Sequence, residues 1–422
     1  MKRAATADLA PRVKDYFQSR LDEMADYVKK LALLESPSNH PDTQKRVQEA
    51  LGESLSRIGY QVRIIPGRES GGHLYARPDA RKRGRPCQML LGHTDTVWPL
   101  GTLREMPVVI EDGNLSGPGV YDMKGGLTQI IFALRCLHHL ELRPAVTPLV
   151  FLNSDEETGS HESEVWIRRL APRVCRVFVL EPSLGREGLI KTARKGIGQF
   201  TISVRGRAAH AGLEPESGAS AILELSYVIQ KLFQLNDPAR GVTVNVGTID
   251  GGLRPNVVAP ESKAVVDVRV PSMEDAREIE QAIYALEPHT PGVHLLVDGS
   301  VGRPPLEPTP RNRRLWKTAR RLGRQLGLDL REGSAGGASD GNTTSLFAAT
   351  LDGLGAVGGG AHASHEFLHI ESLAQRGALL ALLLMAPPER GEGKRRDREE
   401  AQRLKVRDGR QRQPRGQASP GS

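Results

Sequence analysis

Hydrophobic and polar positions alternate along this 422-residue chain in two patterns, one that predicts helices and one that predicts strands. Apolar residues recur at helical spacing over residues 13–34, 44–59 and 125–137. Short apolar runs at residues 73–76, 87–91, 147–152 and 177–180 predict buried strands. Helices that alternate with such strands are typical of an α/β fold, in which a mainly parallel sheet has helices on both faces.

The pattern changes after about residue 195. Residues 199–205 alternate apolar and polar positions, and the next segments predict a helix (218–235), two strands (242–248, 263–270), a helix (273–286) and a strand (293–297). This β-α-β-β-α-β order predicts a ferredoxin-like α+β domain. Arg303-Pro-Pro-Leu-Glu-Pro predicts a rigid linker. After it, predicted helices at 312–326 and 371–385 resume the α/β pattern of the first part of the chain. We therefore expect a domain at 195–303 inserted into a larger one (1–194 and 304–388), followed by a tail (389–422).

Most of the net charge of +8 lies in that tail, whose 11 Lys/Arg and 6 Asp/Glu leave a net +5 there. The tail has almost no apolar residues, so it cannot offset the entropy of ordering, and we expect it to be disordered. A basic tail also suits nucleic acid. Aromatic residues make up only 4% of the chain, however, which argues against base stacking, and we favour a solvated terminus.

Composition also argues against membrane and secreted classes. Apolar runs such as 379–386 are shorter than the roughly 20 residues that span a bilayer. The N-terminal residues lack the apolar stretch of a secretory signal. Cys87, Cys136 and Cys175 are odd in number and far apart, so we expect buried small side chains rather than a disulfide framework. These features predict a cytoplasmic protein that does not contact a membrane.

Side chains that can bind metals follow three predicted strands, at the ends where open α/β sheets collect their ligands. They are His93 and Asp95 after residues 87–91, Asp155-Glu-Glu after 147–152, and Glu181 after 177–180. Each alone has an ordinary structural explanation, such as an acidic helix N-terminus. Nothing structural requires all of them to converge, so together they predict a metal-dependent hydrolase.

Two further candidates stand in glycine-rich loops. Asp122 lies in Gly117-Pro-Gly-Val-Tyr-Asp-Met-Lys-Gly-Gly at a helix start, where glycines let the backbone approach closely. A phosphate-binding loop is the alternative, but its Gly-x-x-x-x-Gly-Lys-Ser/Thr order is absent. The second loop, His362-Ala-Ser-His-Glu, offers His362 and His365, and spacing alone does not choose between them.

Ten segments, taken in order, resemble the M20 metallopeptidases, especially their glutamate carboxypeptidase branch. They are Gly92-His-Thr-Asp-Thr-Val, Gly117-Pro-Gly-Val-Tyr-Asp-Met-Lys-Gly-Gly, Asp155-Glu-Glu-Thr-Gly-Ser, Leu180-Glu-Pro-Ser, Arg194-Lys-Gly, Gly206-Arg-Ala-Ala-His-Ala-Gly, Asn256-Val-Val-Ala-Pro, Asp267-Val-Arg, Gly337-Ala-Ser-Asp-Gly-Asn and Gly358-Gly-Gly-Ala-His. The resemblance covers about residues 15–386. It implies a zinc-exopeptidase-like α/β domain with an inserted lid and dimerisation domain.

The resemblance also implies two Zn²⁺ ions per subunit, with Co²⁺ or Mn²⁺ as substitutes. His93 and Glu181 would bind one ion, Glu157 and His362 the other, and Asp122 both. His362 is chosen over His365 because the family histidine stands four residues before a glutamate, here Glu366.

Other family roles fall on neighbouring residues. Glu156 would be the general base, and Asp95 would accept the second imidazole N–H of His93. Glu366 would lie behind the ligands or on the substrate-amine side. Family members also have a cis peptide after the bridging aspartate, which we expect at Asp122–Met123.

Residues of the inserted domain would contact the substrate. Arg269 resembles the arginine that grips a substrate carboxylate, with Asn256 assisting it. His210 resembles the histidine that reaches the partner's site in dimeric members and stabilises an oxyanion there. The backbone of residues 337–342 would form part of the pocket wall.

The implied activity is hydrolysis of an amide or peptide bond beside a free carboxylate, by a homodimer that pairs through its lid. Its substrate would be a peptide or a small molecule. Deacylases of the acetylornithine deacetylase or succinyl-diaminopimelate desuccinylase type are the alternative within the same chemistry. Two alternatives come from other classes: an inactive metal- or ligand-binding protein, and a nucleic-acid-binding protein. The complete set of metal ligands and general base argues against an inactive protein.

Overall fold

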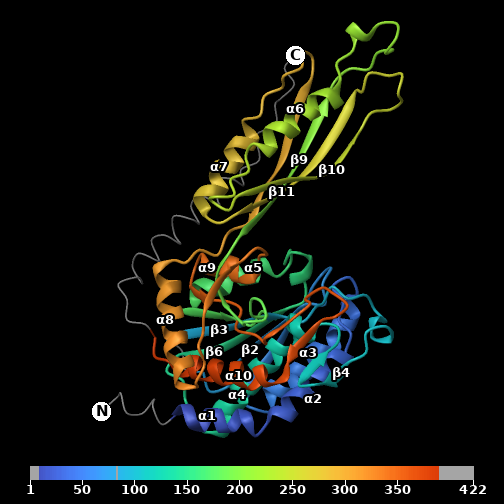
Figure 1. The fold of residues 1–422 in the computed structure, drawn as a ribbon. Coiled ribbons are helices and arrows are strands. Elements are labelled where there is room, and N and C mark those ends of the chain that lie inside the picture. Colours follow the sequence, from blue (N-terminus) through green and yellow to red (C-terminus); the bar gives the residue numbers. More distant parts are fainter. Residues whose placement is uncertain (1–8, 82–83, 389–422) are drawn as a thin grey trace, which may run out of the picture.

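The computed structural model describes residues 9–81 and 84–388, so the tail predicted to be disordered lies outside the described residues. Figure 1 shows a larger lower body and an elongated upper unit. We call the upper unit, residues 196–303, the lid. Within the described ranges, none of the helices combines the length and the apolar composition needed to cross a membrane.

A six-stranded sheet forms the centre of the lower body. Its strands lie in the order β1 (Tyr60–Ile65), β2 (His73–Pro78), β6 (Thr147–Asn153), β3 (Cys87–His93), β7 (Arg176–Val179) and β14 (Ala349–Leu351). The pairs β6–β3, β3–β7 and β7–β14 are parallel, whereas β1 and β2 are antiparallel to their neighbours. The predicted sheet, parallel in most of its pairs, is thereby confirmed.

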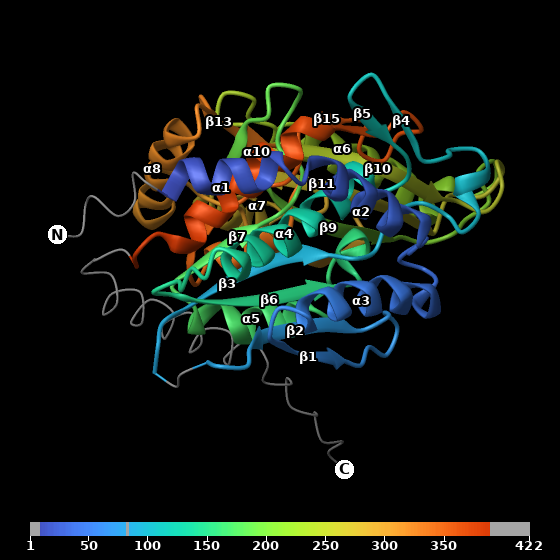
Figure 2. The same ribbon diagram turned by 90° about the horizontal axis from the view of Figure 1, so that it is seen from below.

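Helices cover both faces of this sheet, which explains why its central strands are buried throughout and mostly apolar. On one face, the sheet shares a hydrophobic core with six helices. They are α1 (Leu9–Gln18), α2 (Leu21–Leu33), α3 (Pro41–Ser56), α4 (Gly125–His139), α8 (Pro310–Gln325) and α10 (Ile370–Met385), of which α1 and α2 pack on α4 and α10. Figure 2 shows several of these helices lying across the sheet. Leu90 and Val150 point to this face, whereas Met89 and Phe151 point to the other, where α5 (Glu164–Leu170) packs. Strands buried on both faces are typical of α/β proteins.

The helix predicted over residues 13–34 is two helices. The chain leaves helical geometry at Arg20, where φ is −126° and ψ is 17°. Just before it, the Ser19 hydroxyl donates to the Tyr16 carbonyl, a local bond that competes with the helix. Phe17 and Met24 lie on either side of the break and are both fully buried. The apolar spacing therefore continues across the break, which is why the sequence pattern predicts a single helix.

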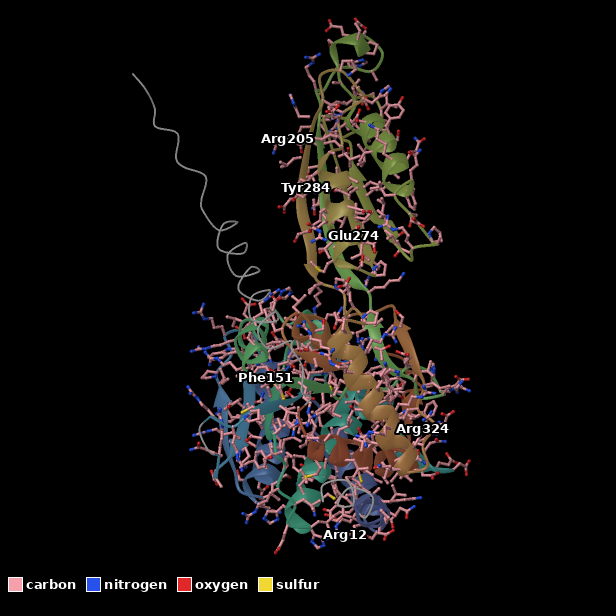
Figure 3. The ribbon with its side chains drawn as sticks, turned by 90° about the vertical axis from the view of Figure 1, so that its left-hand side faces the viewer. Arg12, Phe151, Arg205, Glu274, Tyr284 and Arg324 are labelled. Atoms are coloured by element: carbon pink, nitrogen blue, oxygen red, sulfur yellow. The ribbon has the colours of Figure 1, made fainter. Side chains whose placement is uncertain are left out.

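The lid is the predicted ferredoxin-like unit. Its sheet has the order β10 (Thr243–Gly251), β11 (Glu261–Val270), β9 (Gly196–Arg205) and β12 (His294–Arg303), with antiparallel pairs throughout. Helices α6 (Ala221–Phe233) and α7 (Met273–Tyr284) cover one face. Figure 3 shows the lid from the side, with Arg205, Glu274 and Tyr284 on its surface and Phe151 inside the lower body.

Several short strands were not predicted from the sequence. The glycine-rich loop that begins at Gly117 follows β5 (Asn114–Ser116), which joins β4 (Val109–Glu111), β15 (Gly358–Gly359) and β16 (Phe367–His369) in one sheet. Strands β8 (Ile190–Arg194) and β13 (Glu332–Ala335) form a parallel pair. β12 extends to Arg303, six residues beyond the predicted end at 297, because it continues to pair with β9 past a bulge. The linker therefore begins one residue later than predicted, and Arg303 belongs to the lid sheet.

Candidate metal centre

The structure brings the predicted ligands from five segments to one edge of the central sheet. Because β3, β6 and β7 run parallel, their carboxyl ends share that edge. The ligands are His93 at the end of β3, Glu157 in a helical turn (Glu156–Thr158) after β6, Glu181 after β7, Asp122 just before α4, and His362 between β15 and β16.

The five side chains form two sets that share Asp122. In the first set, Nε2 of His93 lies 3.3 Å from Oδ1 of Asp122 and 3.5 Å from Oε1 of Glu181. In the second, Nε2 of His362 lies 3.1 Å from Oε2 of Glu157 and 3.5 Å from Oδ2 of Asp122. Asp122 thus turns one oxygen toward each histidine, as a ligand shared by two metal ions must.

These contacts fit metal ions better than hydrogen bonds. Oδ1 of Asp122 and Oε1 of Glu157 are buried and receive no hydrogen bond. Ligands about 2.0–2.1 Å from a tetrahedral zinc lie about 3.3–3.4 Å apart. The four separations between histidine and carboxylate atoms, 3.1–3.5 Å, are close to that value. Imidazole and carboxylate ligands suit zinc and its neighbours in the first transition row, so the residues present fit two divalent ions.

The charges of the site are arranged for cations. Burial disfavours a charged His93, but the carboxylates of Asp122, Asp95 and Glu181 outweigh burial and raise its pKa well above the ordinary value. Burial works against an ionised Asp122 as well, yet the two histidines hold its pKa below the usual range. Contacts with Asp122 and Glu157 raise the pKa of His362 to about 10. Divalent cations would take the place of the imidazole protons, because metal binding displaces protons from such groups.

Asp95 connects the first histidine to the acidic turn. Nδ1 of His93 lies 3.0 Å from the Asp95 carbonyl oxygen and 3.4 Å from its carboxylate Oδ1. The carboxylate also accepts hydrogen bonds from the Ser38 hydroxyl and from the backbone N–H groups of Glu156 and Glu157. Asp95 therefore contacts both the imidazole and the turn that presents the acidic pair, and its role in orienting His93 stays a prediction.

The loop of Asp122 is held by Glu366, which is fully buried. Its carboxylate accepts from the backbone N–H groups of Gly119, Tyr121 and Asp122 and from the Trp98 indole. Glu366 thus lies behind the ligands, one of the two positions expected for it. The expected cis peptide at Asp122–Met123 is present.

The histidine loop favours His362 over His365. Both histidines are exposed, but His362 faces Glu157 and Asp122, and His365 makes neither of these contacts. His362 has a positive φ of 61°, unusual for a residue that is not glycine. Such backbone geometry is concentrated at functional sites.

Glu156 has a partner that the sequence did not indicate. Its Oε1 accepts a hydrogen bond of 2.8 Å from Nη1 of Arg303 at the end of the lid sheet. One atom each of Glu156, His93 and Glu181 lie within 4.8 Å of one another, so the carboxylate also reaches the first set of ligands. Burial, with the charge of Glu181, raises the pKa of Glu156 to about 8, and Arg303 opposes that rise.

Two buried cations line the wall beside Glu181. Arg194 in β8 bonds Asp352 at 2.6 Å and lies 3.4 Å from Glu181. Lys191 is 8% exposed, and its ammonium donates no hydrogen bond to any described residue. Burial and the charge of Arg194 lower the pKa of Lys191, whereas Asp352, Glu181 and Asp122 counteract this shift. An unpaired buried cation beside the ligands suits a substrate anion. Lys191 was not predicted from the sequence, because the residues that surround it in the fold are distant from it in the chain.

The three predicted lid residues lie at opposite ends of the lid. Arg269 pairs across the sheet with Ile197, near the lower body, and its guanidinium is held by Asp267 at 2.8 and 3.0 Å. His210 and Asn256 are exposed at the far end, where the Asn256 carbonyl accepts from the Ala211 N–H. Within one chain, strand β11 separates Asn256 from Arg269, so the predicted assistance of Arg269 by Asn256 would need a second subunit.

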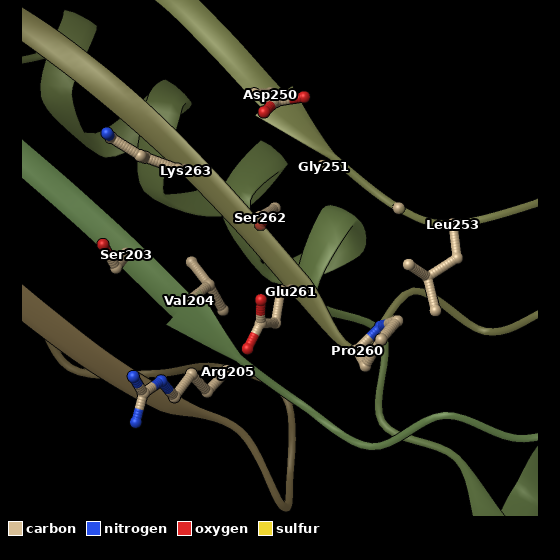
Figure 4. Close-up of a pocket in the computed structure, with 11 residues that line it drawn as sticks. Ser203, Val204, Arg205, Asp250, Gly251, Leu253, Pro260, Glu261, Ser262 and Lys263 are labelled. Carbon is tan, nitrogen blue, oxygen red and sulfur yellow. The ribbon is translucent and has the colours of Figure 1, made fainter.

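A cleft lies at the far end of the lid sheet, away from the ligands. Arg205, Asp250, Glu261 and Lys263 are among its lining residues (Figure 4). It contains none of the predicted ligands, nor Glu156. We therefore assign the chemistry to the metal centre and not to this cleft.

Comparisons with known proteins found similar peptidases. A family model described as "Peptidase dimerisation domain" matches residues 192–287, which cover most of the lid. The chain is similar to carboxypeptidase G2 from Pseudomonas sp. (strain RS-16). The two are 27% identical over 406 residues, which cover 90% of this chain and 94% of that protein.

Solved structures share the fold. Aminopeptidase PepT from Bacillus cereus ATCC 10987 has a TM-score of 0.71 and 21% identity, covering 86% of this chain and 98% of that one. A Bacillus subtilis protein described as a dinuclear metal binding peptidase has a TM-score of 0.63 and 13% identity, covering 87% of this chain and 98% of that one.

Proposed function

Because this chain belongs to the M20 family of metallopeptidases and is a metal-dependent hydrolase, we propose that it hydrolyses an amide or peptide bond beside a free carboxylate with two zinc ions. A glutamate carboxypeptidase-type exopeptidase fits best. The observation that carries this proposal is the shared carboxylate of Asp122, whose two oxygens face His93 and His362 at 3.3 and 3.5 Å.

The chain's own residues would divide the work. His93 and Glu181 would hold one ion, His362 and Glu157 the other, and Asp122 both. Two bound ions supply an activated water and polarise the scissile carbonyl. Glu156 reaches the same space as His93 and Glu181, and each of the two proposed sets has its ligands without it. It would accept the proton of the attacking water and return it to the leaving amine, as a general base and then a general acid.

A free carboxylate on the substrate is supported by two cations. Lys191 places an unpaired ammonium in the wall next to Glu181. Arg269 stands at the end of the lid nearest the lower body, where closure would bring its guanidinium toward the site. A guanidinium binds a carboxylate through two parallel hydrogen bonds. The name of the similar carboxypeptidase G2 points to the same substrate class.

A substrate panel tests this proposal. The zinc-loaded protein should hydrolyse peptides and N-acyl amino acids that end in a free carboxylate, and the matching amides should lose about 10–100-fold in kcat/KM, since a charge-assisted hydrogen bond contributes about 1.5–3 kcal/mol. Lys191→Met should raise KM for the acids and leave the amides unaffected. Equal hydrolysis of the acids and the amides would contradict the proposal that the site recognises a free carboxylate on the substrate.

The same panel separates the alternative. A deacylase of the acetylornithine deacetylase or desuccinylase type would prefer short acyl groups on an amino acid over a second amino acid. Both activities use the same ligands and base, so only the relative kcat/KM values for peptides and short acyl amides distinguish them.

We also propose a homodimer that pairs through the lid. The match to a peptidase dimerisation domain supports it. So do exposed apolar residues on α6 and the edge strand β10, namely Ile222 and Leu223, 48% and 47% exposed, and Ile249, 66% exposed. Apolar groups beside an open strand edge are typical of contact surfaces. His210 and Asn256 would then reach the partner's site from the far end of the lid.

Hybrid dimers test the shared site. His210→Ala and Glu156→Gln homodimers should both be almost inactive. After the two variants are unfolded and refolded together, about half of the dimers are hybrids, each with one intact site, so activity should return to about a quarter of the wild-type value. If the mixture is no more active than its components, His210 does not act across the interface.

A further inference from the structure

The end of the lid sheet is bonded directly to the predicted base. Nη1 of Arg303 donates to Oε1 of Glu156 at 2.8 Å, and Nη2 donates to Oγ of Ser160 at 2.6 Å. Nη2 also lies 3.8 Å from Oδ1 of Asp340. The side chains of Arg303 and Glu156 are only 17% and 11% exposed. This is a shielded ion pair rather than a surface contact, so its geometry is held by several partners.

Arg303 also belongs to the segment that joins the lid to the lower body. It is the last residue of β12 and pairs with Ile197, the second residue of β9. Gly302 precedes it, and a Cβ on Gly302 would meet nothing within 4 Å. The register of the strand pair shifts between Ser300 and Arg303. Any rotation of the lid about these two strands would therefore act first on the residue that holds Glu156.

The ion pair occupies one oxygen of Glu156 and leaves the other available. An atom of the same carboxylate lies within 4.8 Å of ligand atoms of His93 and Glu181. A carboxylate with one oxygen anchored cannot rotate freely about its terminal bond, so the second oxygen keeps one direction. Without the hydrogen bond from Arg303, the Glu156 carboxylate would still be present but would no longer have a fixed orientation. Misplacement of a catalytic group by about 1 Å can lower the rate about 100-fold.

We propose that Arg303 is a positioning residue, which acts on the reaction by fixing the carboxylate of Glu156 from the hinge of the lid. This proposal rests on the proposed function, in which Glu156 is the base. It differs from a role in substrate binding, because the guanidinium already holds Glu156 and Ser160 and faces Asp340.

Steady-state kinetics of the zinc-loaded wild type, Arg303→Gln and Arg303→Lys test it. Arg303→Gln should lower kcat by about 10–100-fold, the usual cost of losing a group that orients a catalytic one, with KM within about twofold. Arg303→Lys should recover part of the loss, since an ammonium can still bond Oε1. Arg313→Gln is the matched control, because it breaks an exposed arginine–carboxylate pair, to Glu332 at 2.7 Å, outside the site. It should leave kcat unchanged.

A second background separates positioning from substrate binding. In Glu156→Asp the shorter carboxylate no longer reaches Nη1, so adding Arg303→Gln should cause little further loss. A rise in KM at unchanged kcat, or a full additional loss in the Glu156→Asp background, would overturn the proposal. If Arg303→Gln does not fold, Ser160→Ala removes the second anchor and should lower kcat in the same direction by less; an unchanged kcat there would count against it. The proposed function fails separately, if Glu156→Gln retains full turnover.

Discussion

Replacing Asp122 with alanine should reduce kcat/KM roughly a thousandfold or more. The two oxygens of Asp122 face Nε2 of His93 at 3.3 Å and Nε2 of His362 at 3.5 Å, so a single substitution removes a ligand from both sets. Metal-ion catalysis contributes several kcal/mol of transition-state stabilisation, and each 1.36 kcal/mol corresponds to a tenfold rate. Metal content, measured by plasma mass spectrometry after gel filtration, should fall from two ions per chain to one or fewer.

The matched control removes a carboxylate that takes no part in the site. Glu187 pairs with Arg331 at 2.9 Å on the surface, and its side chain is 62% exposed. Glu187→Gln should keep both ions and full activity. If Asp122→Ala also keeps two ions and loses little activity, Asp122 is not a shared ligand.

Replacing Glu156 with glutamine should lower kcat by about 100- to 10,000-fold, the range that general acid–base catalysis covers. Glutamine keeps the shape of the side chain and its contact with Arg303, but it cannot accept a proton. The five ligands are untouched, so metal content and KM should stay close to wild type. Retention of both ions separates this result from a collapse of the site.

The pH dependence of the same two proteins gives an independent check. Glu156 must be ionised to accept a proton, so kcat/KM of the wild type should rise with pH on the acid side. Burial and Glu181 push the pKa of Glu156 upward, whereas Arg303 pulls it down. The residual activity of Glu156→Gln should lack that acid limb. An acid limb that survives the substitution would assign the titrating group elsewhere.

The predicted ligands could be found from sequence because each stands at a place with a physical reason. His93, Glu157 and Glu181 follow apolar runs that are buried on both faces of the sheet, and parallel strands bring their carboxyl ends together. Asp122 was marked by the glycines around it. His362 and His365 stand in the same loop, and sequence spacing alone does not show which of them faces the ligands. The choice of His362 depended on the resemblance to the family.

Residues whose neighbours are distant in sequence could not be found in this way. Arg303 lies 147 residues from Glu156, and Arg194 lies 158 residues from Asp352. The break between α1 and α2 could not be predicted either, because apolar residues keep helical spacing across it. The local feature beside the break is one hydrogen bond from the Ser19 hydroxyl. The domain boundaries at residues 194 and 303, the zinc identity, the glutamate-type substrate and the cytoplasmic location stay predictions.

One chain is expected to bind two divalent ions through a shared Asp122. The most direct test is a crystal structure of the zinc-loaded protein with anomalous data collected at the zinc edge. We predict two peaks about 3.5–4 Å apart, one next to His93 and Glu181 and one next to His362 and Glu157, with a carboxylate oxygen of Asp122 on each. A single peak, or two peaks that do not share Asp122, would contradict the account.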